Sequence, residues 1–169
     1  MEIAIAGPKS KPAALAKFFV KNLTTEYISH SELQGYRAVR PCKWAKNIAR
    51  VLEGEIADRL SRPGGHRARV AQWKGAIEGK EGTRLVALAL VTLSREAAVP
   101  FGVIEDVVVD KKRRGAGLGT RMIQWIVDEF RSAGARRLFL ESGVHNEKAH
   151  VLFERLGFEP LSVVMMRDL

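Results

Sequence analysis

Residues 107–120 read VVVDKKRRGAGLGT: a run of valines gives way to four basic residues and then to three glycines at alternate positions. The valines indicate a buried strand, because β-branched side chains favour extended backbone. Beyond the glycines, apolar residues recur at helical spacing at Leu118, Met122, Ile126 and Phe130. The stretch therefore predicts a strand that leads through a glycine-rich junction into an amphipathic helix.

The glycine junction is open to three interpretations: a tight turn, a nucleotide-phosphate cradle, or a site for another phosphorylated ligand. The P-loop pattern fails because no lysine follows these glycines. The dinucleotide fingerprint G-x-G-x-x-G fails because its third glycine would fall at Thr120 or Met122. Amides at a helix N-terminus still favour an anion, and glycine lets a ligand approach the backbone closely. An anion site and a turn with solvated basic residues both remain open.

The rest of the chain shows further apolar periodicity bounded by turn residues. The expected strands are 3–6, 67–73, 84–93, 101–109, 137–141 and 161–167, the expected helices are 12–20, 43–61, 118–130 and 147–156, and turns are expected at 62–65 and 78–83. Strands followed by an alternation of helix and strand are typical of a mixed α/β sheet with helices packed on it.

Length and composition bound the class of protein. The 169 residues, 46% apolar and 28% charged, suit one globular domain, which we expect to span 1–169. The longest apolar stretch, 85–93, is far shorter than the roughly 20 residues that a membrane helix needs. The start has no secretory pattern, and the single cysteine, Cys42, offers neither an internal disulfide nor a metal cluster. These features predict a cytoplasmic protein without a membrane or metal partner.

The net charge of +9 is unevenly distributed. The first 100 residues hold 17 Lys and Arg against 9 Asp and Glu, whereas the remainder holds 11 against 10. A basic half can attract nucleic acid, an anionic membrane or an acidic substrate. The excess is spread over many segments without the aromatic–basic alternation that stacks bases. We therefore expect a solvated surface and no nucleic-acid partner, with a mild preference for an acidic acceptor.

Two motifs resemble those of one enzyme family. Residues 114–119, RGAGLG, fit R-x-x-G-x-G, the acetyl-CoA pyrophosphate motif of the GCN5-related N-acetyltransferases (GNAT superfamily). Residues 146–158 fit the family's N-x-x-A-x-x-L-Y-x-x-x-G-F apart from Phe153, which replaces the tyrosine. The resemblance implies a mostly antiparallel sheet with helices on both faces and a splayed strand pair that holds acetyl-CoA. It covers 67–169, the implied coenzyme-binding core, well, and 1–66, the implied helical acceptor side, only in outline.

The resemblance also implies a reaction: direct transfer of an acetyl group from acetyl-CoA, a co-substrate, to a primary amine of a small molecule or peptide. The pyrophosphate would lie on the loop amides, and the pantetheine arm would run along the strand before the loop. The backbone N–H of Val107 would polarise the thioester carbonyl. The implied coenzyme-binding residues are Val107, Val109, Arg114, Gly115, Ala116, Gly117, Leu118, Gly119, Thr120, Asn146 and Phe153.

The acceptor amine must lose a proton before it attacks, because only the neutral amine is a nucleophile. Many relatives place an acid in the strand beside the thioester, and Glu105 is our first candidate for this base. Strand alternation predicts that Glu105, Val107 and Val109 share one face and that Asp106 points to the other. The other interpretation of Glu105 is a structural carboxylate paired with a basic neighbour.

Phe153 departs from the family pattern, because it cannot protonate the departing thiolate as the tyrosine is proposed to do. Tyr27, Tyr36, His30 and His145 are alternative donors without motif support. The other alternative is that no donor is needed, since a free thiol has a pKa of about 8.5 and its thiolate is a tolerable leaving group at neutral pH. Phe153 also leaves open an alternative function: an acyl-CoA-binding module with weak or no catalysis.

For residues 1–66, the expected acceptor contacts come from the resemblance alone. Because early helices line the acceptor pocket in this family, we expect His30, Glu32 and Tyr36 near the acceptor, with helix capping and loop hydrogen bonds as the alternative. The chain has room for one strand after Gly157, where relatives often place two. The acceptor side is therefore either shortened or completed by a second subunit, which makes a homodimer a hypothesis.

Overall fold

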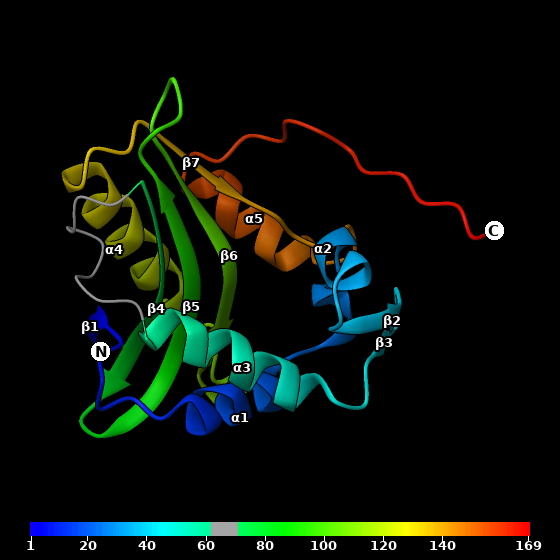
Figure 1. The fold of residues 1–169 in the computed structure, drawn as a ribbon, viewed down its shortest axis with the longest axis horizontal. Coiled ribbons are helices and arrows are strands. Elements are labelled where there is room, and N and C mark those ends of the chain that lie inside the picture. Colours follow the sequence, from blue (N-terminus) through cyan, green and yellow to red (C-terminus); the bar gives the residue numbers. More distant parts are fainter. Residues whose placement is uncertain (62–70) are drawn as a thin grey trace.

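The computed structural model describes residues 1–61 and 71–169. One five-stranded sheet has the order β1 (Glu2–Ile5), β4 (Gln72–Glu81), β5 (Arg84–Ser94), β6 (Phe101–Val109), β7 (Arg137–Leu140). Neighbouring strands are antiparallel except for β6 and β7, which run parallel (Figure 1). The expected mostly antiparallel mixed sheet is confirmed. The turn expected at 62–65 and the first residues of the strand expected at 67–73 lie outside the described residues.

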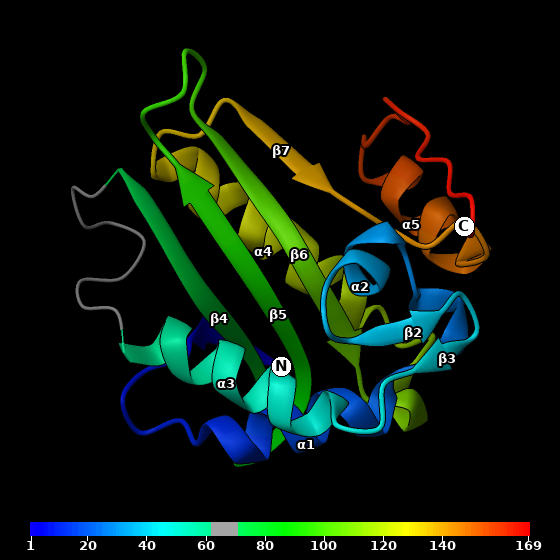
Figure 2. The ribbon, with the colours of Figure 1, turned by 45° about the vertical axis from the view of Figure 1, so that its right-hand side comes forward.

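Helices cover both faces of the sheet (Figures 1 and 2). α1 (Pro12–Asn22) and α3 (Ile48–Ser61) pack on one face, in a core that includes Leu88, Leu90 and Val108. α4 (Leu118–Ser132) and α5 (Glu147–Arg155) contribute to the core on the other face. Within the described part of the chain, no helix is both long and apolar enough to cross a bilayer.

In α4, the apolar residues that recur at helical spacing in the sequence pack into the core. Its apolar stripe is almost completely buried, whereas the residues between are mostly exposed. Burying each such side chain contributes about 1.5–3 kcal/mol relative to leaving it in water. The ring of Phe130 lies over Gly102 of β6, where an added Cβ would be 2.2 Å from its Cδ2 atom. After the helix, Gly134 adopts a φ of +93°, which permits the stop expected from the sequence.

Four short elements lie between α1 and α3: a 3-10 turn η1 (Thr25–Tyr27), α2 (His30–Gln34), β2 (Ala38–Arg40) and β3 (Lys43–Trp44). The helix expected over 43–61 begins only at Ile48, because residues 43–44 pair with β2 instead. Figure 2 shows α2, β2 and β3 near the end of β6, beside the end of β7. These elements form the wall that faces the open part of the sheet.

An expected turn and an expected strand also differ from the structure. The turn expected at 78–83 is much shorter, because β4 runs to Glu81 and the chain reverses at Gly82, which has a φ of +56°. The strand expected at 161–167 does not form: this segment is extended but unpaired, and Figure 1 shows it leading away from the sheet. Alternating apolar residues predicted a strand there, but a strand also needs a neighbour for its backbone groups.

Candidate active site

The site begins where β6 and β7 separate. The two strands pair from Phe101 with Arg137 to Ile104 with Leu140, where β7 ends, whereas β6 continues to Val109. Figure 2 shows the two strands diverging at this point. Within residues 1–61 and 71–169, β6 therefore has a strand neighbour only on its β5 side from residue 105 onward.

The backbone of Val107 and Val109 faces this open edge. Asp110 N donates to Val86 O at 2.9 Å, so residues 110 and 86 form a hydrogen-bonded pair of the β5–β6 ladder. Antiparallel ladders alternate hydrogen-bonded and non-hydrogen-bonded pairs. The N–H and C=O groups of Val107 and Val109 thus point away from β5. An extended ligand chain could pair with them as a further strand would.

A β-bulge in β6 redirects the acidic residues. Val91 pairs with Ile104 and Leu90 with Asp106, so Glu105 is an extra residue without an opposite partner. Glu105 and Asp106 both make side-chain contacts on the α1–α3 side, whereas Val107 packs against the core on the α4 side. The expectation that Glu105 shares a face with Val107 and Val109, opposite Asp106, is wrong because the bulge shifts the alternation.

The glycine loop joins β6 to α4 through a 3-10 turn, η2 (Lys111–Arg113). Gly115 and Gly117 have φ values of +82° and +72°, a region that costs other residues energy. Gly117 is the N-cap of α4 and has no side chain to bond the first amides of the helix. The amides of the first helical turn are thus left for an anionic partner, and Thr120 is exposed beside them.

Arg114 of the loop is exposed and also contacts the end of α1: its Nη2 donates to Asn22 O at 2.7 Å. The buried side chain of Asn22 accepts from Lys111 N at 2.9 Å and donates to Phe18 O at 2.8 Å. α1 therefore holds the base of the glycine loop in place. No local pattern in the sequence indicates this role of Asn22, since the contact joins residues 89 positions apart.

The second motif forms α5 and the residues at its two ends. Asn146 is the N-cap of α5, but its side chain makes no capping hydrogen bond, so its amide group is not used there. Phe153 is half-buried, packs against the core on the α4 side, and its ring lies 6.2 Å from that of Phe158. α5 also approaches α4, because a Cβ added to Gly119 would lie 3.3 Å from Leu152 Cδ2.

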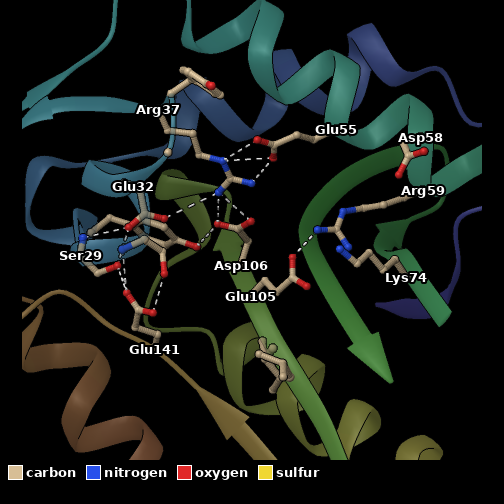
Figure 3. Close-up of a pocket in the computed structure, with 16 residues that line it drawn as sticks. Ser29, Glu32, Arg37, Glu55, Asp58, Arg59, Lys74, Glu105, Asp106 and Glu141 are labelled. Atoms are coloured by element: carbon tan, nitrogen blue, oxygen red, sulfur yellow. Dashed lines mark hydrogen bonds and ion pairs between the residues drawn. The ribbon is translucent and has the colours of Figure 1, made fainter. Parts of the chain in front are cut away.

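A cavity of about 430 Å³ opens on the α2 side of the bulge (Figure 3). Its lining includes more acidic than basic side chains, in contrast with the basic chain as a whole. The acids are Glu32, Glu55, Asp58, Glu105, Asp106 and Glu141, and the bases are Arg37, Arg59 and Lys74. The cavity charge therefore opposes the mild preference for an acidic acceptor inferred from the overall charge.

Glu105 lines this cavity with both carboxylate oxygens engaged. One oxygen pairs with Arg59 Nη2 of α3, and the other accepts from the hydroxyl of Thr92. Arg59 is buried and donates through Nη1 to Val91 O at 3.2 Å. Glu105 thus combines the two interpretations left open by the sequence, since it pairs with a basic neighbour and also faces the cavity.

Asp106 is the centre of a second network, shown in Figure 3. Its two oxygens lie 2.9 Å from Arg37 Nη1, and Arg37 also pairs with Glu55 of α3. Burial raises the pKa of Asp106, although Arg37 and Tyr27 act in the opposite direction. Burial opposes the charge of Arg37, but Asp106 and Glu55 outweigh it and raise the pKa of the guanidinium.

Tyr27 connects Asp106 to the open edge. Its hydroxyl donates to Asp106 Oδ1 at 2.8 Å and accepts from Val107 N at 3.2 Å. Burial, and then the charge of Asp106, raise the pKa of Tyr27 well above 10. The ring packs edge-on against Phe19 and beside Trp44. From the sequence, Tyr27 was only one of four possible proton donors, and no motif supported it. A contact between residues 80 positions apart leaves no local pattern in the sequence.

The other acceptor-side candidates have different environments. Glu32 is buried and forms a capping box with Ser29, while Tyr36 is 84% exposed at the cavity rim. His30 Nδ1 lies 2.9 Å from Glu141 Oε1. Burial opposes the charge of Glu141, but hydrogen bonds from Ser29 and Ser31 hold its pKa below its usual range. Glu32 and Tyr36 thus line the cavity, whereas His30 contacts Glu141, which lines it. Glu141 was not among the residues predicted from the sequence.

Known proteins share stretches of this sequence. The chain is 43% identical over 68 residues to the glucosamine 6-phosphate N-acetyltransferase of Trypanosoma brucei brucei, covering 40% of this chain and 44% of the relative. It is 39% identical over 57 residues to N-alpha-acetyltransferase 30 of Schizosaccharomyces pombe, covering 34% of this chain and 38% of that protein. The chain therefore matches less than half the length of these relatives.

Solved structures share the whole fold. A transcriptional regulator from Bacillus halodurans superposes with a TM-score of 0.70 at 13% identity, covering 99% of both chains. An aminoglycoside antibiotic 6'-N-acetyltransferase from Acinetobacter haemolyticus has a TM-score of 0.63 at 16% identity, covering 100% of this chain and 98% of that one. At such identities the likeness shows the fold alone. The model of the acetyltransferase (GNAT) family matches residues 38–158, more than half of the sequence, and the chain therefore belongs to this family.

Proposed function

We propose that this protein is an acyltransferase that moves an acetyl group from acetyl-CoA directly to a primary amine. One observation carries the proposal: the open edge of β6 runs from the amides of the glycine loop at one end to the cavity at the other. An extended thioester held along this edge would have its phosphates on a helix N-terminus and its acyl group beside the cavity. The family match supports the same reaction.

The coenzyme would be held mainly by backbone groups. The amides around Gly117 to Thr120 would bind the pyrophosphate, and Val107 and Val109 would pair with the pantetheine arm. Asn146 would contact the arm through its uncommitted amide, and Phe153 would pack against it. Arg114 would support the site through the hydrogen bond that its Nη2 donates to Asn22 O at the end of α1.

The reaction would take place at Val107. Its N–H faces the open edge and would polarise the thioester carbonyl, on which negative charge develops as the amine attacks. The amine would approach from the cavity and arrive as an ammonium ion, because a lysine-like amine has a pKa of about 10.4. Glu105 would take its first proton, since it faces the cavity and is partly open to solvent. The acid-rich lining favours a cationic acceptor over an anionic one.

The unpaired C-terminal segment supports a homodimer. Residues 161–169 expose apolar side chains, among them Leu161, Val163 and Met165. β7 is an edge strand, so its outer side can accept another strand. The tail of a second copy would pair there and cover its apolar residues. Light scattering at micromolar concentration tests this arrangement: a monomeric mass contradicts it, and a chain ending at residue 160 should lose dimerisation.

The cellular setting belongs to the same proposal. Cys42 is the only cysteine and its side chain is exposed, and exposed thiols persist in reducing compartments. We therefore place the protein in the cytoplasm. Fractionation of cells that express the full chain is the direct measurement.

The activity test mixes the protein with acetyl-CoA and a panel of amines and follows the release of free thiol. The panel includes diamines, amino sugars, amino acids, peptides and the weakly basic amine methoxyamine. We expect thiol release above background with at least one class. Calorimetry with coenzyme A separates the alternatives: binding without turnover of any amine favours an inactive acyl-CoA-binding module, and absence of binding contradicts both functions.

A further inference from the structure

The proposed reaction moves two protons from nitrogen. An ammonium ion becomes an amide with one N–H, the sulfur of coenzyme A gains one proton, and the other proton passes to solvent. Glu105 at the open cavity accounts for the first transfer. Phe153 has no acidic hydrogen, so the second motif supplies no group for the transfer to sulfur. A carrier for the second proton is therefore unassigned.

The hydroxyl of Tyr27 lies at the place where this carrier is needed. It accepts from Val107 N at 3.2 Å, and this N–H is the group proposed to bind the thioester oxygen. In the structure, the phenolic oxygen thus occupies the position of a carbonyl oxygen on the open edge. Tyr27 is among the residues that line the cavity from which the amine would arrive, and its hydroxyl donates to Asp106 Oδ1 at 2.8 Å.

We propose that Tyr27, backed by Asp106, carries the second proton from the acceptor nitrogen to the departing sulfur of coenzyme A. This inference rests on the proposed function. When acetyl-CoA binds, its carbonyl oxygen takes over the Val107 N–H, and the hydroxyl stays beside the thioester, held by Asp106. Tyr27 is then a catalytic residue, and Asp106 is a positioning and proton-storing residue that acts through it.

The proton steps balance. As the C–N bond forms, the nitrogen gives a proton to Tyr27 Oη, and the hydroxyl gives its own proton to Asp106. As the C–S bond breaks, Asp106 returns a proton to Tyr27 Oη, which gives one to the sulfur. The products are an amide and a thiol, and both side chains end as they began.

The environment suits each partner to its role. Burial raises the pKa of Asp106, which makes this carboxylate a better temporary proton acceptor. Burial and the charge of Asp106 raise the pKa of Tyr27, so the hydroxyl relays protons without being lost as phenolate. The charged and titratable groups around Asp106 come from η1, α2, the segment before β2, α3 and β6: Tyr27, Glu32, Arg37, Glu55 and Glu105.

A structural role for the hydroxyl is the competing explanation, because it also ties η1 to the sheet. Tyr27→Phe separates the two roles, since the ring keeps its contacts with Phe19 and Trp44 and only the hydroxyl is removed. Ser132→Ala is the control, because it removes an exposed hydroxyl at the end of α4, away from the cavity. Thermal unfolding and coenzyme A affinity by calorimetry show whether each variant retains the fold and the coenzyme site.

The decisive measurement is kcat against pH in the full chain, with the weakly basic amine methoxyamine as acceptor. This amine is uncharged at neutral pH, so the first deprotonation by Glu105 is not needed. In the parent, kcat should fall as pH is lowered through the raised pKa of Asp106, because a protonated Asp106 cannot accept. In Tyr27→Phe, kcat at neutral pH should fall about 100-fold, and its decrease in acid should shrink to the part that protonation of methoxyamine itself causes, with coenzyme affinity unchanged. Ser132→Ala should keep the parental profile.

Asp106→Asn provides a second variant. If the pair acts as a unit, Tyr27→Phe combined with Asp106→Asn should be no slower than either single variant. If the parent is active and Tyr27→Phe has the same kcat, the inference about Tyr27 is wrong. It is also wrong if Tyr27→Phe is slower but its kcat falls in acid as strongly as that of the parent. Neither result contradicts the proposed function. A parent that binds no coenzyme and releases no thiol with any amine overturns the proposed function together with it.

Discussion

The two sides of the site are held in different ways. On the coenzyme side, residues 101–134 form β6, the glycine loop and α4, and a continuous apolar stripe anchors them to the core. On the acceptor side, residues 23–44 form four short elements with few buried apolar side chains. These elements are fixed by polar contacts to distant strands, such as that of Arg37 with Asp106.

This difference separates binding of the common co-substrate from selection of the acceptor. A helix with a regular apolar face tolerates little rearrangement, because protein interiors are close-packed. A segment held by a few ion pairs and hydrogen bonds can change its residues, and with them the cavity, without disturbing the sheet.

The strongest test is Arg37→Gln, which removes the cation between two carboxylates. Asp106 would remain buried without its charged partner, and breaking such a pair costs about 3–5 kcal/mol of unfolding free energy at neutral pH. Urea unfolding at pH 7 measures the loss. Arg40→Gln, in an exposed position three residues away, is the control and should change stability by less than about 0.5 kcal/mol.

The loss in Arg37→Gln should depend on pH in a definite direction. The folded-state pKa of Asp106 is raised, so its protonated form stabilises the folded state below the unfolded pKa of about 3.9. This contribution disappears as pH rises through the folded pKa, and removal of Arg37 raises that pKa further. The deficit of the variant should therefore shrink as pH is lowered from 7 towards 4. A deficit that is constant over this range contradicts the role of Asp106.

On the coenzyme side, Gly117→Glu places a carboxylate at the loop amides, and coenzyme A affinity should fall about 100-fold or more, which is about 2.7 kcal/mol. The positive φ of Gly117 adds a folding cost of about 1–2 kcal/mol. Gly117→Asn is the matched control, because asparagine tolerates this φ and adds no charge. Calorimetry on folded samples decides: if Gly117→Glu binds as tightly as the parent, the loop does not hold the pyrophosphate.

The same contrast explains which parts of the structure the sequence could predict. The strand–glycine–helix order was visible because periodic burial and glycine at positive φ leave local signals, as at Phe130 and Gly117. The bulge at Glu105 left no local signal in the sequence, since the position of an extra residue depends on how β6 pairs with β5. The contact of Tyr27 with Val107 and that of Asn22 with Lys111 depend on tertiary geometry. The proposed base and coenzyme residues thus came from motifs, whereas the acceptor network required the structure.

A smaller effect is expected at Gly102, which lies beneath Phe130. An added Cβ would be 2.2 Å from Phe130 Cδ2 and 2.8 Å from Leu138 Cδ1, so Gly102→Ala should lower the unfolding free energy by about 1–3 kcal/mol. Gly54→Ala is the control in the middle of α3, where an added Cβ meets no atom within 4 Å, and it should raise stability by about 0.5–1 kcal/mol. Urea midpoints that move in the same direction for both variants would contradict this packing.

The smallest effect is expected at the contact between α2 and the end of β7. Ser31 donates to Glu141 through its hydroxyl at 2.6 Å and its amide at 3.2 Å, but the site is exposed and water competes. Ser31→Ala should therefore cost no more than about 1 kcal/mol. The folded pKa of Glu141 is lowered, so its contribution is present above its unfolded pKa and is lost as pH falls through the folded pKa. The difference between Ser31→Ala and the parent should vanish in acid, and a difference that grows there would mean that the serine hydroxyl does not stabilise the charged carboxylate.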